Sequence, residues 1–253
     1  MQETPVGISS VIDPVAEEAR IRFGVEYLYP YQRLVIANVL DYASSFREAS
    51  DHETISAAGE TDNPSEHPDR LRQVVLLPTG YGKSLCFQLP ALLLAGLTLA
   101  IYPLRSLMAD QARRLRTRGI PCAVLQGGVP PEDRENALDG IRSGRVRIAL
   151  ANPEILRSGS VLSVLRSVRI DHAVVDEAHC VAEWGDSFRP AYRDLGDLVR
   201  YLDPGAVTAF TATASPGILR RTAEVLFGGE PWRLVAGDPD RPNLRYACAP
   251  TLS

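Results

Sequence analysis

The stretch VVLLPTGYGKS, residues 74–84, determines the predicted fold of this chain. Its first four residues are apolar and suit a strand that is buried on both faces of a parallel sheet. Pro78 ends this run, glycines follow at positions 80 and 82, and a helix-compatible segment begins at Leu85. The order of strand, glycine-rich turn and helix predicts a ligand-binding loop at the carboxyl end of a buried strand.

The residue types in this turn favour binding of a triphosphate. Phosphates need many donors at close range, and glycine lets the backbone approach them closely. The following helix adds unpaired N–H groups and the positive end of its dipole. Lys83 is expected to reach the outer phosphates, and the Ser84 hydroxyl to hold Mg²⁺. The surrounding backbone is expected to come from Thr79, Gly80, Tyr81 and Gly82.

One position departs from the general pattern G-x-x-x-x-G-K-[ST], because this chain has Leu77 where the pattern has its first glycine. The alternative interpretation is a chance glycine-rich turn. The apolar run before the turn and the helical run after it favour the phosphate-binding loop.

Composition limits the class of protein. With 253 residues, of which 45% are hydrophobic, the chain suits one large domain with a sizeable core. The net charge is −4, so contact with nucleic acid has to come from a local face. The cysteines at positions 86, 122, 180 and 248 form no C-x-x-C pair and indicate neither a zinc site nor a disulfide framework.

The N-terminal residues show no basic segment followed by an apolar core, which a secretory signal would need. The most apolar later stretch, residues 91–102, is too short to span a bilayer. We therefore expect no membrane partner and a cytoplasmic location, in a bacterial-type cytosol or at the nucleoid.

From residue 73 onward, strand and helix patterns alternate. The expected strands are residues 73–77, 98–102, 122–125, 146–150, 171–175, 207–210 and 232–235. The expected helices are residues 83–94, 106–116, 132–142, 161–166, 191–201 and 216–227. This alternation predicts an α/β fold with a doubly wound, mostly parallel sheet in three α/β/α layers. In such sheets ligands bind beyond the carboxyl ends of the strands.

Two helices are expected before the sheet. Asp13 as N-cap and Pro14 at the first helical position predict a helix that runs to about Phe23. A second helix is expected from about Tyr31. Its buried face is expected to contain Val35, Val39, Tyr42 and Phe46. Residues 47–70 lack periodicity and aromatic residues, which predicts a mobile surface insertion or, as the alternative, a partner-binding loop.

A second candidate site follows the strand expected at residues 171–175. Asp176 and Glu177 emerge at the carboxyl end of that strand. Asp176 is expected to hold Mg²⁺ through its water shell, and Glu177 to orient the attacking water. The alternative is a solvated acidic strand end, but the Gly-Lys-Ser upstream favours the metal-nucleotide site.

The chain resembles the first RecA-like motor domain of superfamily 2 DEAD/DEAH-box helicases and, within them, the RecQ family of DNA helicases. The resemblance covers residues 23–246. The segments that carry it are LPTGYGKSLCFQLPAL (77–92), YPLRSLMADQ (102–111), ANPEIL (151–156), VVDEAHCVAEWGDSFRPAY (174–192), TATA (211–214) and DPDRPNLRY (238–246). The resemblance implies a P-loop NTPase fold and an ATP-dependent, 3′ to 5′ DNA helicase activity, with His179 of the Asp-Glu-Ala-His box among the catalytic residues.

The segment after that box is typical of RecQ helicases, in which an aromatic-rich loop senses single-stranded DNA and couples it to ATP hydrolysis. Trp184 and Phe188 are expected to stack on bases, and Arg189 to pair with a phosphate. The alternative is that the two aromatic residues belong to the core. The usual His-Asp of this loop is Asp186-Ser187 here.

Upstream, residues 23–32 resemble the adenine-recognition motif of the family. Gln32 is expected to hydrogen-bond the adenine edge. The family has arginine where this chain has Tyr29, which can still stack on adenine. Tyr102 likewise replaces the usual serine before Pro103. These departures indicate a divergent relative.

The expected organisation is an N-terminal and adenine-recognition segment at residues 1–32, an ATP-binding domain at residues 33–237, and the start of a linker at residues 238–253. The resemblance implies a second RecA-like domain, in a parent chain or in trans, and single-stranded or junction DNA as partner. The chain alone is expected to bind ATP without unwinding DNA. The alternative function is an ATP-responsive DNA- or protein-binding module.

Overall fold

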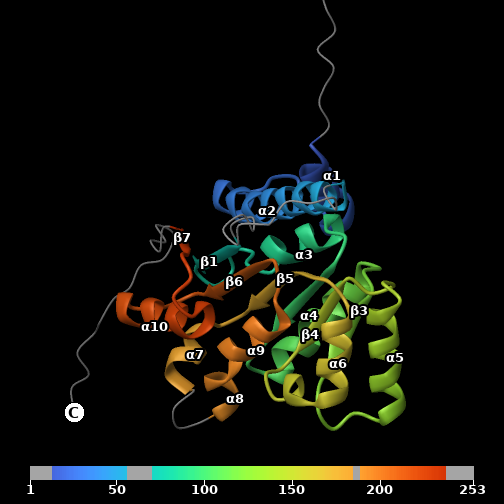
Figure 1. Ribbon diagram of the computed structural model, residues 1–253. Coiled ribbons are helices and arrows are strands. Elements are labelled where there is room, and N and C mark those ends of the chain that lie inside the picture. Colours follow the sequence, from blue (N-terminus) through green and yellow to red (C-terminus); the bar gives the residue numbers. More distant parts are fainter. Residues whose placement is uncertain (1–12, 56–69, 185–188, 238–253) are drawn as a thin grey trace, which may run out of the picture.

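The computed structural model describes residues 13–55, 70–184 and 189–237 (Figure 1). Seven strands form one sheet in the order β3-β4-β2-β5-β6-β1-β7, and every paired neighbour runs parallel. The strands are β1 (Leu71–Leu76), β2 (Leu97–Ile101), β3 (Cys122–Leu125), β4 (Ile148–Ala151), β5 (Ile170–Val175), β6 (Ala206–Thr211) and β7 (Arg233–Ala236). The predicted doubly wound parallel sheet is therefore confirmed.

Helices cover both faces of the sheet. One face carries α2 (Pro30–Ile55), α3 (Leu85–Leu93) and α4 (Arg105–Thr117), and α1 (Pro14–Phe23) packs beside α3. The remaining helices cover the other face, and Figure 1 shows α7, α9 and α10 on the side of the sheet away from α1 and α2. They are α5 (Pro131–Arg142), η1 (Ile155–Arg157), α6 (Gly159–Ser167), α7 (His179–Trp184), α8 (Pro190–Arg193), α9 (Leu195–Leu202) and α10 (Pro216–Phe227).

The central strands are apolar along their whole length because both of their faces are covered. All residues of β2, β4, β5 and β6 are buried. At the edge of the sheet β7 is different, since Leu234 remains 49% exposed there. Continuous burial on both sides is the reason why these strands show no alternation of apolar and polar residues.

A buried row of polar side chains fixes α2 on the sheet. The Asn38 amide donates to Gln73 at 3.1 Å, and the Gln73 amide donates to the Thr208 hydroxyl at 3.0 Å. His172 lies 2.8 Å from the same hydroxyl, and complete burial lowers its pKa to about 3. The imidazole is therefore neutral at physiological pH, and the row links α2 to β1, β6 and β5 without a buried charge.

Several predicted boundaries need correction. Helix α2 continues to Ile55, so residues 47–55 are helical, although the mobile surface insertion was expected to begin at Arg47. The rest of that insertion, residues 56–69, lies outside the described residues. The helix expected at residues 191–201 is two helices, because Asp194 ends α8 and precedes α9. The short helices η1 and α7 were not predicted, since each is too short to show a helical period.

Within the described residues, no helix is both long enough and apolar enough to cross a membrane.

Candidate active site

The loop between β1 and α3 depends on its two glycines. Both have positive φ, +88° at Gly80 and +74° at Gly82, which side chains other than glycine rarely adopt. A β-carbon on Gly80 would meet no atom within 4 Å, whereas one on Gly82 would lie 2.5 Å from the Gln32 amide nitrogen. Gly80 is thus needed for its conformation alone, and Gly82 also because α2 approaches the loop closely.

Helix α3 begins at Leu85, later than the predicted start at Lys83. A tight turn precedes it, in which the N–H of Leu85 donates to Gly82 O and the N–H of Cys86 donates to Lys83 O, both at 3.0 Å. The Ser84 side chain makes no capping hydrogen bond to the helix. Its hydroxyl is therefore not used to cap the helix and suits a metal ligand at this position.

Lys83 is the only lysine in the sequence. Its ammonium group is buried and has no hydrogen-bond acceptor in the described part of the chain. The nearest opposite charge is Glu177 Oε1 at 3.9 Å, which is too far for a hydrogen bond. A buried ammonium without an acceptor is costly, so this position favours an anionic ligand.

Two carboxylates face Lys83 from the end of β5. Burial, and next the charge of Glu177, raises the pKa of Asp176 to about 6, while Lys83 acts in the opposite direction. Asp176 Oδ1 accepts the N–H of Glu177 at 3.0 Å. Glu177 has a φ of +49°, a strained value for a residue that is not glycine. Backbone strain at Glu177 and an unfavourable buried charge at the adjacent Asp176 are typical of a functional site.

His179 connects this strand end with the neighbouring one. Its Nδ1 lies 3.0 Å from Thr211 Oγ1 and 3.5 Å from Glu177 Oε2. The Thr211 hydroxyl donates to Thr213 O, so it accepts the Nδ1 proton of His179. The N–H of Ala178 also donates to Phe210 O at 2.8 Å. The Asp-Glu-Ala-His and TATA segments thus form one hydrogen-bonded unit.

The adenine-recognition residues lie directly against the phosphate-binding loop. Gln32 donates to Tyr81 O at 3.2 Å and accepts the N–H of Tyr29 at 2.9 Å. The Tyr29 and Tyr31 rings are nearly parallel, with centroids 5.5 Å apart, and Tyr31 stacks on Tyr81 at 5.8 Å. Of these ring-stacking tyrosines, only Tyr29 was predicted from the sequence to contact adenine. The spacing of tyrosines at positions 27, 29 and 31 could have indicated the cluster.

Arg189 is held by protein groups. Its guanidinium contacts Glu154 through two nitrogens and donates to Pro103 O, and it lies over the Tyr192 ring at 5.1 Å. The side chain is only 21% exposed. This arrangement joins three of the segments that carry the RecQ resemblance. Trp184 ends α7, but its side chain and all of Phe188 lie outside the described residues.

The site suits Mg²⁺ together with a nucleotide. Among the described residues, no three or more His, Cys, Asp or Glu side chains gather into a metal-binding group. Mg²⁺ commonly binds one or two carboxylates and completes its shell with phosphates and water. Asp176 and Ser84 supply the donor types for this arrangement, and a cation at Asp176 would relieve its unfavourable buried charge.

Known proteins show similar sequences and folds. The DEAD/DEAH box helicase family model matches residues 29–220. "ATP-dependent DNA helicase RecQ" of Synechocystis is 47% identical over 147 residues, covering 56% of this chain and 31% of the relative. "Probable ATP-dependent DNA helicase RecS" of Bacillus subtilis is 43% identical over 154 residues, covering 60% of this chain and 31% of the relative.

The solved structures agree on the fold. The DUF1998 helicase MrfA bound to DNA superposes with a TM-score of 0.62 at 20% identity, covering 94% of this chain and 31% of that one. A hypothetical ATP-dependent RNA helicase from Sulfolobus tokodaii superposes with a TM-score of 0.59 at 19% identity, covering 88% of this chain and 57% of that one. The chain spans less than a third of the length of the two curated relatives. It belongs to the DEAD/DEAH box helicase family, with the RecA-like fold of that family, and its resemblance to RecQ helicases is confirmed.

Proposed function

We propose that the chain is the nucleotide-binding half of an ATP-dependent DNA helicase of RecQ type, which hydrolyses Mg-ATP in response to single-stranded or junction DNA and moves 3′ to 5′. The observation that carries the proposal is the buried Lys83 ammonium without an acceptor, between a glycine loop and two carboxylates. The curated relatives named as DNA helicases support DNA as the partner.

Each residue has a separate role in this proposal. Lys83 binds the outer phosphates, and the loop glycines let the backbone N–H groups approach them. Ser84 and Asp176 hold Mg²⁺, which supplies positive charge beside the phosphates. Glu177 orients the attacking water, and its strained backbone fixes the carboxylate near Lys83.

The base and the DNA would be bound by flanking segments. Tyr29 stacks on adenine, and Gln32 recognises its edge while it also holds the loop through Tyr81 O. Trp184 and Phe188 stack on DNA bases, and Arg189 exchanges Glu154 for a phosphate. A second RecA-like domain, in a parent chain or in trans, supplies the arginine that phosphoryl transfer requires on the far side of the phosphates.

Calorimetric titration with Mg-ATP tests the proposal. Lys83→Ala removes the phosphate donor and is expected to weaken ATP binding about 10–100-fold, since hydrogen bonds to charged groups contribute about 1.5–3 kcal/mol. The matched control is Arg142→Ala, which removes an exposed cation on α5. Equal ATP affinities for Lys83→Ala and the parent would refute the assignment of the loop.

The DNA part is tested by ATP turnover with and without single-stranded DNA. Trp184→Ala combined with Phe188→Ala is expected to reduce DNA-stimulated turnover more than DNA-free turnover, because each stacked ring contributes about 1–3 kcal/mol to base binding. Equal reduction of both rates, or loss of the folded state, would show instead that these rings belong to the core.

A further inference from the structure

The amino-terminal edge of the sheet carries a group of arginines that the proposed function does not use. Arg22, Arg145 and Arg147 line a cavity of about 230 Å³, together with Ile120 and Pro121. Arg145 and Arg147 precede β4, and Ile120 and Pro121 precede β3, so the cavity opens at the strand starts. We call Arg22, Arg118, Arg145 and Arg147 the amino-edge arginines.

This surface lies opposite the phosphate-binding loop. All strands are parallel, so their carboxyl ends share one edge and their amino ends the other. The strands between the edges contain four to six residues, which corresponds to about 13–20 Å of extended chain. The amino-edge arginines are therefore a surface separate from the nucleotide site.

The positive charge of this surface is largely uncompensated. Arg22 lies 3.7 Å from Glu18, the only carboxylate that lines the cavity. Within the described part of the chain, Arg118, Arg145 and Arg147 form no ion pair, and all three are exposed. The cavity lining has three arginines and one glutamate, a charge of +2, and Arg118 over the Phe23 ring adds a further positive charge, on a chain whose net charge is −4.

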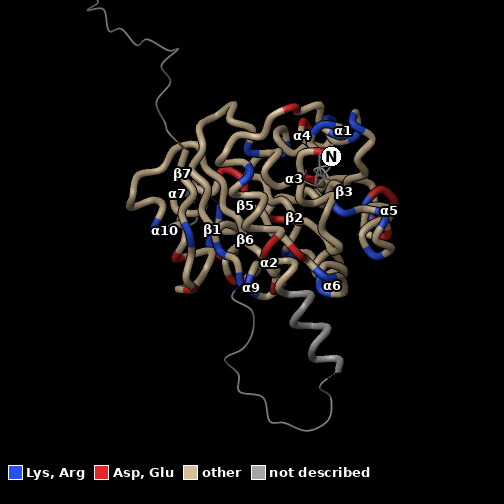
Figure 2. Tube along the Cα trace, turned by 90° about the horizontal axis from the view of Figure 1, so that it is seen from above, with Lys and Arg blue, Asp and Glu red and all other residues tan. Residues whose placement is uncertain are grey.

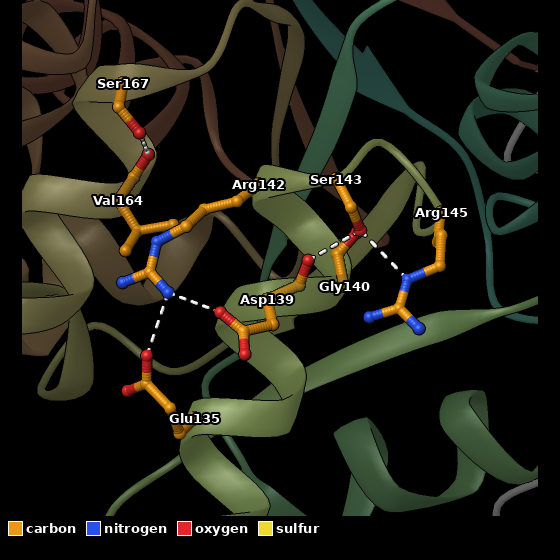
Figure 3. Close-up of polar contacts among 8 residues, drawn as sticks. All are labelled: Glu135, Asp139, Gly140, Arg142, Ser143, Arg145, Val164 and Ser167. Carbon is orange, nitrogen blue, oxygen red and sulfur yellow. Dashed lines mark hydrogen bonds and ion pairs between the residues drawn. The ribbon is translucent and has the colours of Figure 1, made fainter.

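The neighbouring Arg142, by contrast, has its positive charge balanced by two carboxylate partners. Figure 3 shows its guanidinium between the carboxylates of Glu135 and Asp139, at 2.8 and 2.5 Å. In the same view Arg145 reaches only the Ser143 hydroxyl, at 2.9 Å. In Figure 2, segments coloured for Lys and Arg lie beside α1 and near β3. Among the described residues, Arg118, Arg145 and Arg147 thus differ from Arg142 in having no carboxylate partner.

The C-terminal ends of neighbouring helices offset part of this positive charge. Helices α1, α3 and α4 all end near this edge, and each C-terminus carries a partial negative charge of about half a unit. Arg147 donates to Leu94 O and Arg118 donates to Arg114 O. Each of these carbonyls uses one nitrogen of the guanidinium, and both side chains belong to exposed residues, so donors remain for a ligand.

We infer that the amino-edge arginines bind the phosphate backbone of double-stranded DNA. The choice of DNA rests on the proposed function, which brings DNA to this chain. Duplex is favoured over single strand because no aromatic ring lines the cavity, and the nearby Phe23 ring is covered by Arg118 at 5.7 Å. Single-stranded DNA is held largely by base stacking, whereas arginine contacts to a duplex backbone need no ring.

The test measures binding of a fluorescent blunt-ended duplex by anisotropy over a range of salt concentrations, without nucleotide. Arg145→Gln with Arg147→Gln should weaken binding about tenfold at roughly 0.1 M salt and lower the slope of log affinity against log salt by about 2. The control is Arg113→Gln with Arg142→Gln, which removes two arginines that already have carboxylate partners. It should change the affinity much less.

A second variant protects the test against misfolding. Arg22→Gln with Arg145→Gln leaves the contact between Arg147 and Leu94 O intact and should give the same loss. Equal losses in the control and amino-edge variants, or no loss in either, would overturn the inference. So would unchanged duplex binding with reduced binding to vesicles of phosphatidylserine and phosphatidylcholine, which would assign the surface to a membrane.

The same samples separate this inference from the proposed function. Lys83→Ala should bind the duplex like the parent while it loses Mg-ATP binding. Normal Mg-ATP binding together with unchanged duplex binding in the amino-edge variants would refute this inference alone. If Lys83→Ala bound Mg-ATP like the parent while the amino-edge variants still bound the duplex more weakly, the proposed function alone would be refuted.

Discussion

The two edges of the sheet carry charge in opposite ways. At the carboxyl edge, Lys83 lies near Asp176 and Glu177, and these side chains are largely shielded from solvent. The ammonium group of Lys83 and the carboxylate of Glu177 are 3.9 Å apart and form no hydrogen bond. At the amino edge the arginines are exposed and lack carboxylates, apart from the long contact between Arg22 and Glu18. A buried charge has a large cost that a ligand can remove, whereas an exposed charge is screened by water and salt.

This difference predicts two kinds of mutational effect. At the carboxyl edge single substitutions should change affinity, rate or stability strongly, because each charge acts at short range in a poorly solvated site. At the amino edge the effects should be small for each residue and should depend on salt. The following experiments test the carboxyl edge, from the largest expected effect to the smallest.

Glu177→Gln should have the largest effect. It keeps the shape of the side chain and removes the base proposed to orient water, so ATP turnover with single-stranded DNA should fall about 10²–10⁴-fold. ATP affinity should stay within a few-fold of the parent. Turnover is measured together with the proposed second motor domain, with the exposed Glu183→Gln as control. Unchanged turnover would mean that another residue positions the water.

The sequence predicted the parts of this edge that depend on local residue order. A buried apolar run, two glycines and Lys83-Ser84 predict the loop, and Asp176-Glu177 after the apolar run at residues 173–175 predicts the carboxylates. Parallel strands then bring them together, because carboxyl ends meet at one edge. Local order and topology were sufficient here.

Tertiary contacts were not predictable in the same way. Arg189 was expected to be available to a phosphate, but its partner Glu154 is 35 residues away in the sequence. The left-handed φ of Glu177 has no glycine to signal it. The extension of α2 to Ile55 was missed because helix formation needs only backbone hydrogen bonds, whereas its prediction relied on an apolar face.

Asp176→Asn should stabilise the protein when no metal is present. The folded-state pKa of about 6 is above the ordinary value of 3.8, so the fold prefers the protonated carboxyl group. At pH 8 the parent keeps an ionised, buried carboxylate, and its removal should raise the free energy of unfolding by about 1–3 kcal/mol. The gain should shrink as the pH falls through 6 and vanish below about 4, where the parent carboxyl group is protonated in both states.

Urea unfolding in EDTA at several pH values measures this effect. The control is Asp41→Asn, an exposed carboxylate on α2. A stability gain that is independent of pH would show that the carboxylate charge at Asp176 is not its source. The same variant should lose Mg²⁺-dependent nucleotide affinity, which separates a metal ligand from a residue that only destabilises the fold.

Tyr29→Ala should have the smallest effect on ATP affinity, and it tests whether the adenine base binds at this ring. The ring is 53% exposed and stacks on Tyr31, so part of the aromatic surface remains when it is removed. ATP affinity should fall about three- to tenfold, the lower part of the range for one stacked ring. Inorganic triphosphate, which has no base, should bind Tyr29→Ala and the parent equally, whereas Lys83→Ala should weaken both ligands.

Tyr27→Ala provides the matched control for this last measurement. Its ring meets Tyr29 edge-on at 5.6 Å and is 65% exposed, so it should contribute less to base binding. The backbone N–H of Tyr29 still donates to Gln32 in both variants, so the start of α2 keeps its cap. If Tyr29→Ala weakened ATP and triphosphate equally, the tyrosine cluster would act by supporting the loop through Tyr81, and the base would have to be bound elsewhere.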